Sequence, residues 1–156
     1  MWKAFQRYRA LDPETRALFR RAVFLMPRVN LSLHVRGFQK TQRALQEQLS
    51  RAIPELPNGN EDAERAVQTT CRMVRAATHY TLIRPTCLVE SFTLWYLLRQ
   101  QSLPATLRIG VRKAAEKFEA HAWVESEGMA LNQAAEPHQH YAAFDSEFCN
   151  LPDYRS

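Results

Sequence analysis

The sequence predicts an α+β domain, with helices in its first half and a small antiparallel sheet after them. Helix start signals and apolar residues at helical spacing occupy the first half of the chain. Residues 105–112 then alternate between apolar and polar side chains, which is typical of a half-buried strand. The strand-like segments 118–125 and 129–133 follow at hairpin spacing. A chain of 156 residues can bury one core, so we expect a single domain over residues 1–156.

The first two helices are predicted from a cap and from helix breakers. Asp12 is a capping carboxylate, and Pro13 suits the first position of a helix. Because proline removes a backbone donor, we expect this helix to end at Pro27. A second helix is expected over about residues 29–53, with a bend or break at Gly37.

Two further helices complete the helical part. The third is expected over about residues 61–78, after a loop rich in proline, glycine and asparagine. Cys71 falls on its apolar stripe, which predicts a packed core thiol. The fourth is expected over about residues 87–101, because Thr86 can cap it and Pro85 disfavours helix before it.

The sheet is predicted to be a meander of three strands. Residues 113–117 form a polar connection between the first two strands, and residues 126–128 form a tight turn before the third. Helices followed by hairpin-connected strands are typical of the α+β class.

The basic residues are concentrated in the first third of the chain, and the formal net charge is +5. They include Arg7, Arg9, Arg16, Arg20, Arg21, Arg28, Arg36, Lys40, Arg43 and Arg51. Such a face can meet nucleic acid, a membrane surface or an acidic peptide, although a solvated helix face is the simplest interpretation. No nucleic-acid motif accompanies the charge, so we expect no nucleic-acid partner.

Composition also restricts the compartment. No apolar run is long enough to cross a bilayer, and the N-terminus lacks the apolar core of a secretion signal. The three cysteines form neither an even disulfide framework nor a metal-binding spacing. Reduced thiols, and hence a cytoplasmic protein, are the expectation.

A thiol and an imidazole occupy the positions of a nucleophile and its base. Cys87 begins the fourth expected helix, where backbone N–H groups stabilise a thiolate. His121 lies on the second expected strand, and its imidazole can accept the thiol proton. The two residues need to meet in space, not in sequence. His138 and His140 have the spacing of a metal pair but lack a third ligand, so we expect no metal.

Four segments together resemble a known family. They are residues 84–88 around Cys87, residues 94–98, residues 104–111, and residues 120–125 around His121. In this combination they resemble the lasso-peptide leader peptidases, which are transglutaminase-like, papain-related cysteine proteases. The resemblance implies a papain/transglutaminase-like core, with the catalytic-cysteine helix packed on a small antiparallel sheet. This core would span about residues 81–156, after a helical part of about residues 1–80.

The resemblance also implies an activity and its partners. Family members use a thioester acyl-enzyme, here on Cys87, to remove the leader peptide from a ribosomally made lasso-peptide precursor. A separate cyclase then closes the macrolactam ring and is itself a candidate partner. Many members work with a separate leader-recognition protein, and the length of this chain fits the stand-alone form. No cofactor is implied, and the setting would be the bacterial cytoplasm.

The third catalytic position depends on the register of the last hairpin. A two-residue turn after Ser126 places Asn132 opposite Trp123, on the face of His121, whereas a three-residue turn brings Gln133 to that face. Members of the family usually carry an acid in this strand, and it can align with Gln133. On chemical grounds Asn132 is the preferred candidate, because an asparagine can orient the imidazole in papain-like proteases.

Two other functions remain open. An acyl-transferring transglutaminase or amidase of the same fold would use the same nucleophile and base with a different acceptor. A non-catalytic peptide-binding module is favoured by the missing acid at residues 131–133. Consumption of an amine would favour the first function. A Cys87 thiol that resists alkylation at neutral pH would favour the second.

Overall fold

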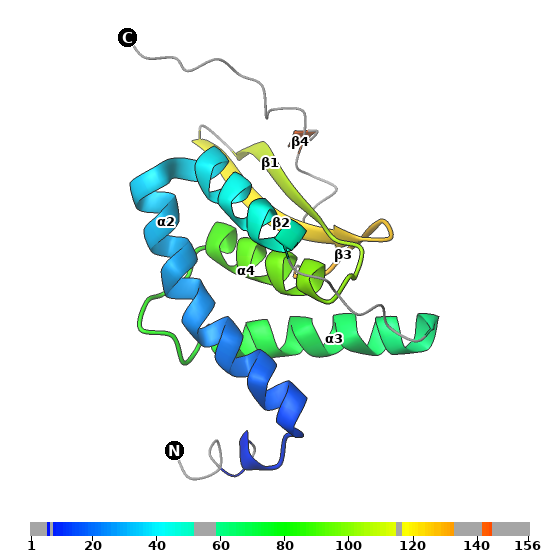
Figure 1. Cartoon of the computed structure of the whole chain (residues 1–156). Coiled ribbons are helices and arrows are strands. Elements are labelled where there is room, and N and C mark those ends of the chain that lie inside the picture. Colours follow the sequence, from blue (N-terminus) through cyan, green and yellow to red (C-terminus); the bar gives the residue numbers. More distant parts are fainter. Residues whose placement is uncertain (1–5, 7, 52–58, 115–116, 133–141, 145–156) are drawn as a thin grey trace.

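A computed structural model describes residues 6, 8–51, 59–114, 117–132 and 142–144. The helices α2 (Pro13–Arg51), α3 (Asn60–Ala77) and α4 (Cys87–Gln100) precede the strands β1 (Thr106–Ala114), β2 (Lys117–Ser126), β3 (Met129–Ala130) and β4 (Ala142–Phe144). Helix α4 contacts the other two helices on one side and strands β1 and β2 on the other (Figure 1). The predicted α+β class is therefore confirmed.

Helix α2 begins where the sequence predicts and continues further than it predicts. The Asp12 carboxylate accepts a hydrogen bond from the Thr15 N–H at 2.8 Å, which confirms the cap. The expected end at Pro27 is wrong, since Pro27 lies inside the helix. Met26 and Val29 are buried on either side of it, so core packing outweighs the backbone hydrogen bond that proline cannot form.

The bend expected at Gly37 divides α2 into a first arm, residues 13–36, and a second arm, residues 38–51 (Figure 1). Gly37 adopts φ 75° and ψ 178°, a backbone conformation that is essentially restricted to glycine. The hydroxyl oxygens of Ser32 and Thr41 lie 2.9 Å apart, and their hydrogen bond joins the two arms.

We expect Gly37→Ala to lower the free energy of unfolding by about 1–3 kcal/mol, the typical cost of a side chain in this backbone conformation. A Cβ atom at this position meets nothing within 4 Å, so the cost comes from the backbone and not from a clash. Urea denaturation measures the change, with Lys40→Ala, an exposed position of the second arm, as the control. Equal stability of the two variants would contradict a bend that depends on glycine.

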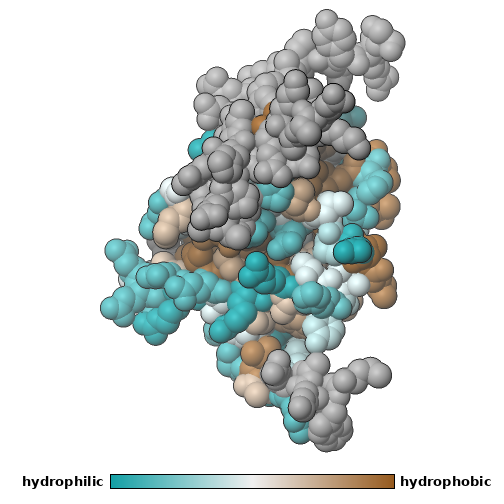
Figure 2. Space-filling model, turned by 180° about the vertical axis from the view of Figure 1, so that it is seen from behind, coloured by the Kyte–Doolittle hydropathy of each residue, from teal (hydrophilic) through white to brown (hydrophobic). Residues whose placement is uncertain are grey.

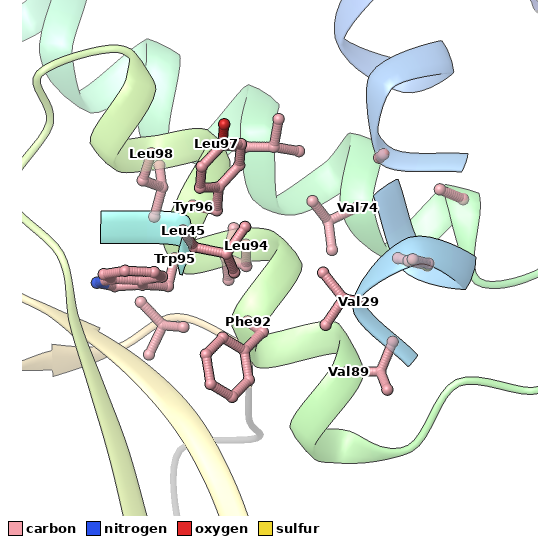
Figure 3. Packing of buried hydrophobic residues seen from close by; sticks show 14 of the residues in the cluster. Val29, Leu45, Val74, Val89, Phe92, Leu94, Trp95, Tyr96, Leu97 and Leu98 are labelled. Carbon is pink, nitrogen blue, oxygen red and sulfur yellow. The ribbon is translucent and has the colours of Figure 1, made fainter. Parts of the chain in front are cut away.

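Helix α4 is the centre of the hydrophobic core. Residues 91–98 are all buried, as expected of a helix that is apolar on nearly every side. Val29 and Leu45, from the two arms of α2, and Val74 of α3 pack around it (Figure 3). Cys71 is half-buried against the same cluster, in agreement with its prediction as a packed thiol. Within the described residues, no helix has the length and apolar character needed to cross a membrane.

The strands form one antiparallel sheet with the order β3-β2-β1-β4. Strand β1 pairs with β2 along its whole length, and both strands extend into the expected polar connection. The two-residue turn is confirmed, because Ser126 pairs with Met129. Glu127 and Gly128 between them have φ values of 50° and 79°, the positive values that a tight hairpin turn needs.

Two features of the sheet differ from the prediction. Strand β3 ends at Ala130, although a strand was expected over residues 129–133. The Asn132 side chain explains the early end, because its Oδ1 atom accepts the Val124 N–H that a longer β3 would bind. A fourth strand, β4, pairs with β1 and was not expected from the sequence.

Candidate active site

Cys87 is the first residue of α4, as the sequence predicts. The Thr86 hydroxyl oxygen accepts a hydrogen bond from the Val89 N–H at 3.4 Å and so caps the helix. The Cys87 thiol is not in a disulfide, and the residue is half-buried. The free N–H groups of the first turn and the helix dipole favour negative charge at this point.

His121 lies in β2, opposite Gly110 of β1. Its ring stacks on that of Trp123, with ring centroids 6.4 Å apart and 15° between the planes. Trp123 is held by a hydrogen bond of 2.8 Å from its Nε1 to Glu125, and the Glu125 carboxylate also binds Arg108 at 3.0 Å. This row of side chains on one face of the sheet restricts the orientation of the imidazole.

The first turns of α4 pack against β2 beside His121. Ser91, one turn after Cys87, donates a buried hydrogen bond of 2.9 Å to the carbonyl oxygen of Ala122. Ala122 directly follows His121 in the chain. The structure therefore brings together the two segments that the sequence singled out, the helix start with the thiol and the strand with the imidazole.

The alternation of side chains along β2 also gives the face of the strand that carries His121. Val124 packs into the hydrophobic cluster around α4, and side chains alternate along a strand, so His121 lies on the opposite face of β2. The Ser91 hydrogen bond joins the two segments through a side chain of α4 and a backbone carbonyl oxygen of β2. Catalytic hydrogen bonds often tighten only when substrate binds.

Asn132 connects the same helix and strand. Its Nδ2 atom donates a hydrogen bond to the Ser91 hydroxyl oxygen at 2.8 Å, and its Oδ1 atom accepts the Val124 N–H at 2.9 Å. Ser91 thus holds two partners, the Asn132 amide and the Ala122 carbonyl oxygen. We call Ser91, Asn132 and the backbone of residues 122 and 124 the polar clamp.

The polar clamp places Asn132 differently from the sequence prediction. Because β3 ends at Ala130, Asn132 does not continue the strand opposite Trp123, and its amide contacts α4 instead. Gln133, the alternative candidate, lies outside the described residues. The orientation of the imidazole by Asn132 or Gln133 stays a prediction.

Ser91 was not expected to belong to the site. A signal for it exists in the sequence, since it is a hydroxyl in an apolar run four residues after Cys87. A polar group buried in such a helix needs a hydrogen-bond partner, but the sequence does not indicate which one. Trp123 is fully buried, and its stacking on His121 was not expected from the sequence.

Burial shifts two ionisable groups near the start of α4. It raises the pKa of the Cys71 thiol to about 11, so this thiol is protonated at neutral pH. It also raises the pKa of the Glu90 carboxyl, which the nearby Arg75 guanidinium partly offsets.

We expect iodoacetamide at pH 7 to modify Cys87 well before Cys71. The thiolate is the reactive form, and only about one Cys71 side chain in 10⁴ is ionised four pH units below its pKa of about 11. Peptide mapping by mass spectrometry assigns the modified residue. The rate at Cys71 should rise as the pH approaches 11. Equal rates at the two cysteines at pH 7 would contradict a buried, protonated Cys71.

The described part of the chain contains no candidate metal site. Nowhere in it do three or more histidine, cysteine, aspartate or glutamate side chains come together in a way that could hold a metal ion. His138 and His140 lie outside that part. The candidate site consists of a thiol, an imidazole and an amide. A thiol nucleophile with a general base is sufficient for acyl transfer.

Comparison with known families supports this type of chemistry. A family model described as the transglutaminase-like superfamily matches residues 25–145. The matched region includes α3, α4 and the sheet, and with them Cys87, His121 and Asn132. No curated protein and no solved structure matches the chain.

Proposed function

The chain belongs to the transglutaminase-like superfamily, and from this premise we propose that it is a cysteine peptidase that removes the leader peptide from a lasso-peptide precursor. The superfamily suggests cysteine-protease or acyltransferase chemistry. The observation that carries the proposal is the Ser91 hydrogen bond to Ala122, which sets the helix start with Cys87 beside the strand with His121. The precursor is inferred from the resemblance of the segments around these two residues.

The proposed reaction has two steps. The Cys87 thiolate attacks the scissile carbonyl carbon, the peptide C–N bond breaks, and His121 gives its proton to the leaving amine. Water, activated by the same imidazole, then hydrolyses the thioester and releases the leader with a free carboxylate. The Cys87 N–H at the start of α4 donates a hydrogen bond to the oxyanion.

Asn132 acts in this proposal as a positioning residue. Its contacts with Ser91 and Val124 support a role in holding β2, and with it His121, against α4.

The proposal includes the partners and compartment of the lasso-peptide pathway. The precursor peptide is the substrate, a separate leader-recognition protein delivers it, and the macrolactam-forming cyclase receives the cleaved product. The compartment is the bacterial cytoplasm, and neither a cofactor nor nucleic acid takes part.

A cleavage assay tests the proposal against the acyl-transfer alternative. The chain is mixed with a candidate precursor and its recognition protein, with and without a primary amine such as glycine methyl ester, and the products are weighed. A leader with a free carboxylate under both conditions is expected. If the main product were the leader joined to the added amine by an amide bond, the chain would be an acyltransferase. If the precursor stayed uncleaved in both mixtures and Cys87 were unreactive, the chain would be a binding module.

A further inference from the structure

A groove lies between the two arms of α2, with α4 as its floor. Its volume is about 1020 Å³, large enough for several side chains of a bound peptide. The first arm contributes Ala17, Arg20, Arg21, Phe24, Leu25 and Arg28, among others. The second arm contributes Thr41, Ala44, Leu45 and Gln48, and α4 contributes Tyr96, Leu97 and Gln100.

An exposed apolar stripe runs along the first arm in this groove. Phe24, Leu31 and Val35 are 71%, 64% and 73% exposed, although large apolar side chains are mostly buried in folded proteins. With Arg28 they recur every three or four residues, so they share one helix face. Figure 2 shows hydrophobic patches along the edge formed by α2 and by the loop before α4. Large apolar side chains exposed together on one helix face indicate an interaction site.

The rim of the groove is uniformly positive. Arg20, Arg21, Arg28 and Arg36 line it and are exposed, and no aspartate or glutamate lines it. None of these four arginines takes part in an ion pair with another described residue. Their charge is therefore available to acidic groups of a ligand.

The second arm and α4 give the groove a fixed shape. The Tyr96 hydroxyl donates a hydrogen bond to Gln48 Oε1 at 3.1 Å and accepts one from Gln100 Nε2 at 3.1 Å. The hydrogen bond between Ser32 and Thr41 ties the two arms together. A groove held in this way needs little reorganisation on binding, which favours affinity.

We propose that this groove binds an acidic amphipathic helix of a protein partner. The apolar face of such a helix would cover Phe24, Leu31 and Val35, and its acidic residues would meet the arginines on the rim. The concave shape favours a helix over a flat membrane surface, and the narrow apolar stripe favours it over a nucleic-acid backbone. The inference deepens the proposed function, because it gives a delivery partner a docking site away from Cys87.

The test measures binding of a synthetic probe. The probe is a fluorescein-labelled helical peptide of about 18 residues, five turns, with leucines on one face and glutamates flanking them. Its control is a peptide of the same composition whose shuffled order has no apolar face. Fluorescence anisotropy with the full chain is expected to show that the amphipathic probe binds at least about tenfold more tightly than its control.

Matched variants locate the binding surface. Leu31→Glu should weaken probe binding at least about tenfold, because it buries a charge against the leucine face. Leu82→Glu, at a residue that is 99% exposed outside the groove, should leave binding unchanged. Replacing Arg20 and Arg28 by glutamate should weaken binding and its salt dependence, whereas Arg72→Glu, an exposed position of α3, should have a smaller effect.

Three outcomes would overturn the inference. If the chain bound the amphipathic probe and the shuffled control with equal affinity, the binding would be charge attraction only. If the Leu31→Glu and Leu82→Glu variants bound the probe with equal affinity, the binding site would lie outside the groove. Tighter binding to vesicles of equal phosphatidylglycerol and phosphatidylcholine, lost in Leu31→Glu, would show a membrane surface instead. The binding assay involves no cleavage. A negative binding result therefore does not contradict the proposed peptidase reaction. A negative cleavage result does not contradict peptide binding in the groove.

Discussion

Cys87→Ala is expected to abolish leader removal, with a loss of at least about 10³-fold in kcat. The change removes the sulfur atom that forms the thioester, and no neighbouring group in the proposed reaction can replace it. Because Cys87 is a half-buried residue at a helix start, the loss of its small thiol should leave the fold intact. Cleavage is measured by weighing the products, and circular dichroism verifies the fold.

Cys71→Ala is the matched control for this prediction. It also removes a thiol, but from a position packed against the core on α3, so cleavage should continue while stability falls moderately.

His121→Ala should be nearly as severe as Cys87→Ala, because the base and acid of both steps are lost. Normal cleavage by Cys87→Ala protein would show that the thiol is not the nucleophile. Loss of wild-type activity in a chelator, restored by zinc, would show that a metal takes part.

The sequence predicts those parts of the fold that depend on local interactions. Asp12 and Thr86 both cap the helices they were expected to cap. Gly37 bends α2 because only glycine readily adopts its backbone angles. The hairpin register also follows from local geometry, since Gly128 allows a two-residue turn and thereby pairs Ser126 with Met129.

The parts that could not be predicted depend on contacts distant in sequence. Pro27 lies within a helix because the core fixes its neighbours, and local rules do not include that packing. Strand β4 pairs with β1 across more than thirty residues of chain and carries no alternation of its own. The polar clamp joins Ser91 to Asn132 over 41 residues, a contact that no pattern within either segment could reveal.

The same distinction applies to the site. Cys87 and His121 were predicted because each has a recognisable local context, a helix start and a strand within a resembling motif. Their relative placement is a tertiary property. The stacking of His121 on Trp123 and the end of β3 before Asn132 both arise from the packed sheet.

Loss of the polar clamp is expected to lower kcat by about tenfold or more while KM stays nearly unchanged. Asn132→Ala removes the side-chain amide and with it the hydrogen bonds to the Ser91 hydroxyl and the Val124 N–H. Ser91→Ala removes the hydroxyl that donates to the Ala122 carbonyl oxygen. Each change leaves a buried polar group unpaired, so the free energy of unfolding should also fall by about 1–3 kcal/mol. Steady-state kinetics and urea denaturation measure the two effects.

A double-mutant cycle separates positioning from simple destabilisation. If Ser91 and Asn132 act together on the strand that carries His121, the double variant should lose less activity than the product of the two single losses. Asn132→Asp keeps an acceptor for the Val124 N–H and should recover part of the activity that Asn132→Ala loses.

Gln133→Ala tests the alternative register, in which Gln133 orients the imidazole. If that variant alone lost activity, the positioning residue would be Gln133, and the clamp would serve only stability.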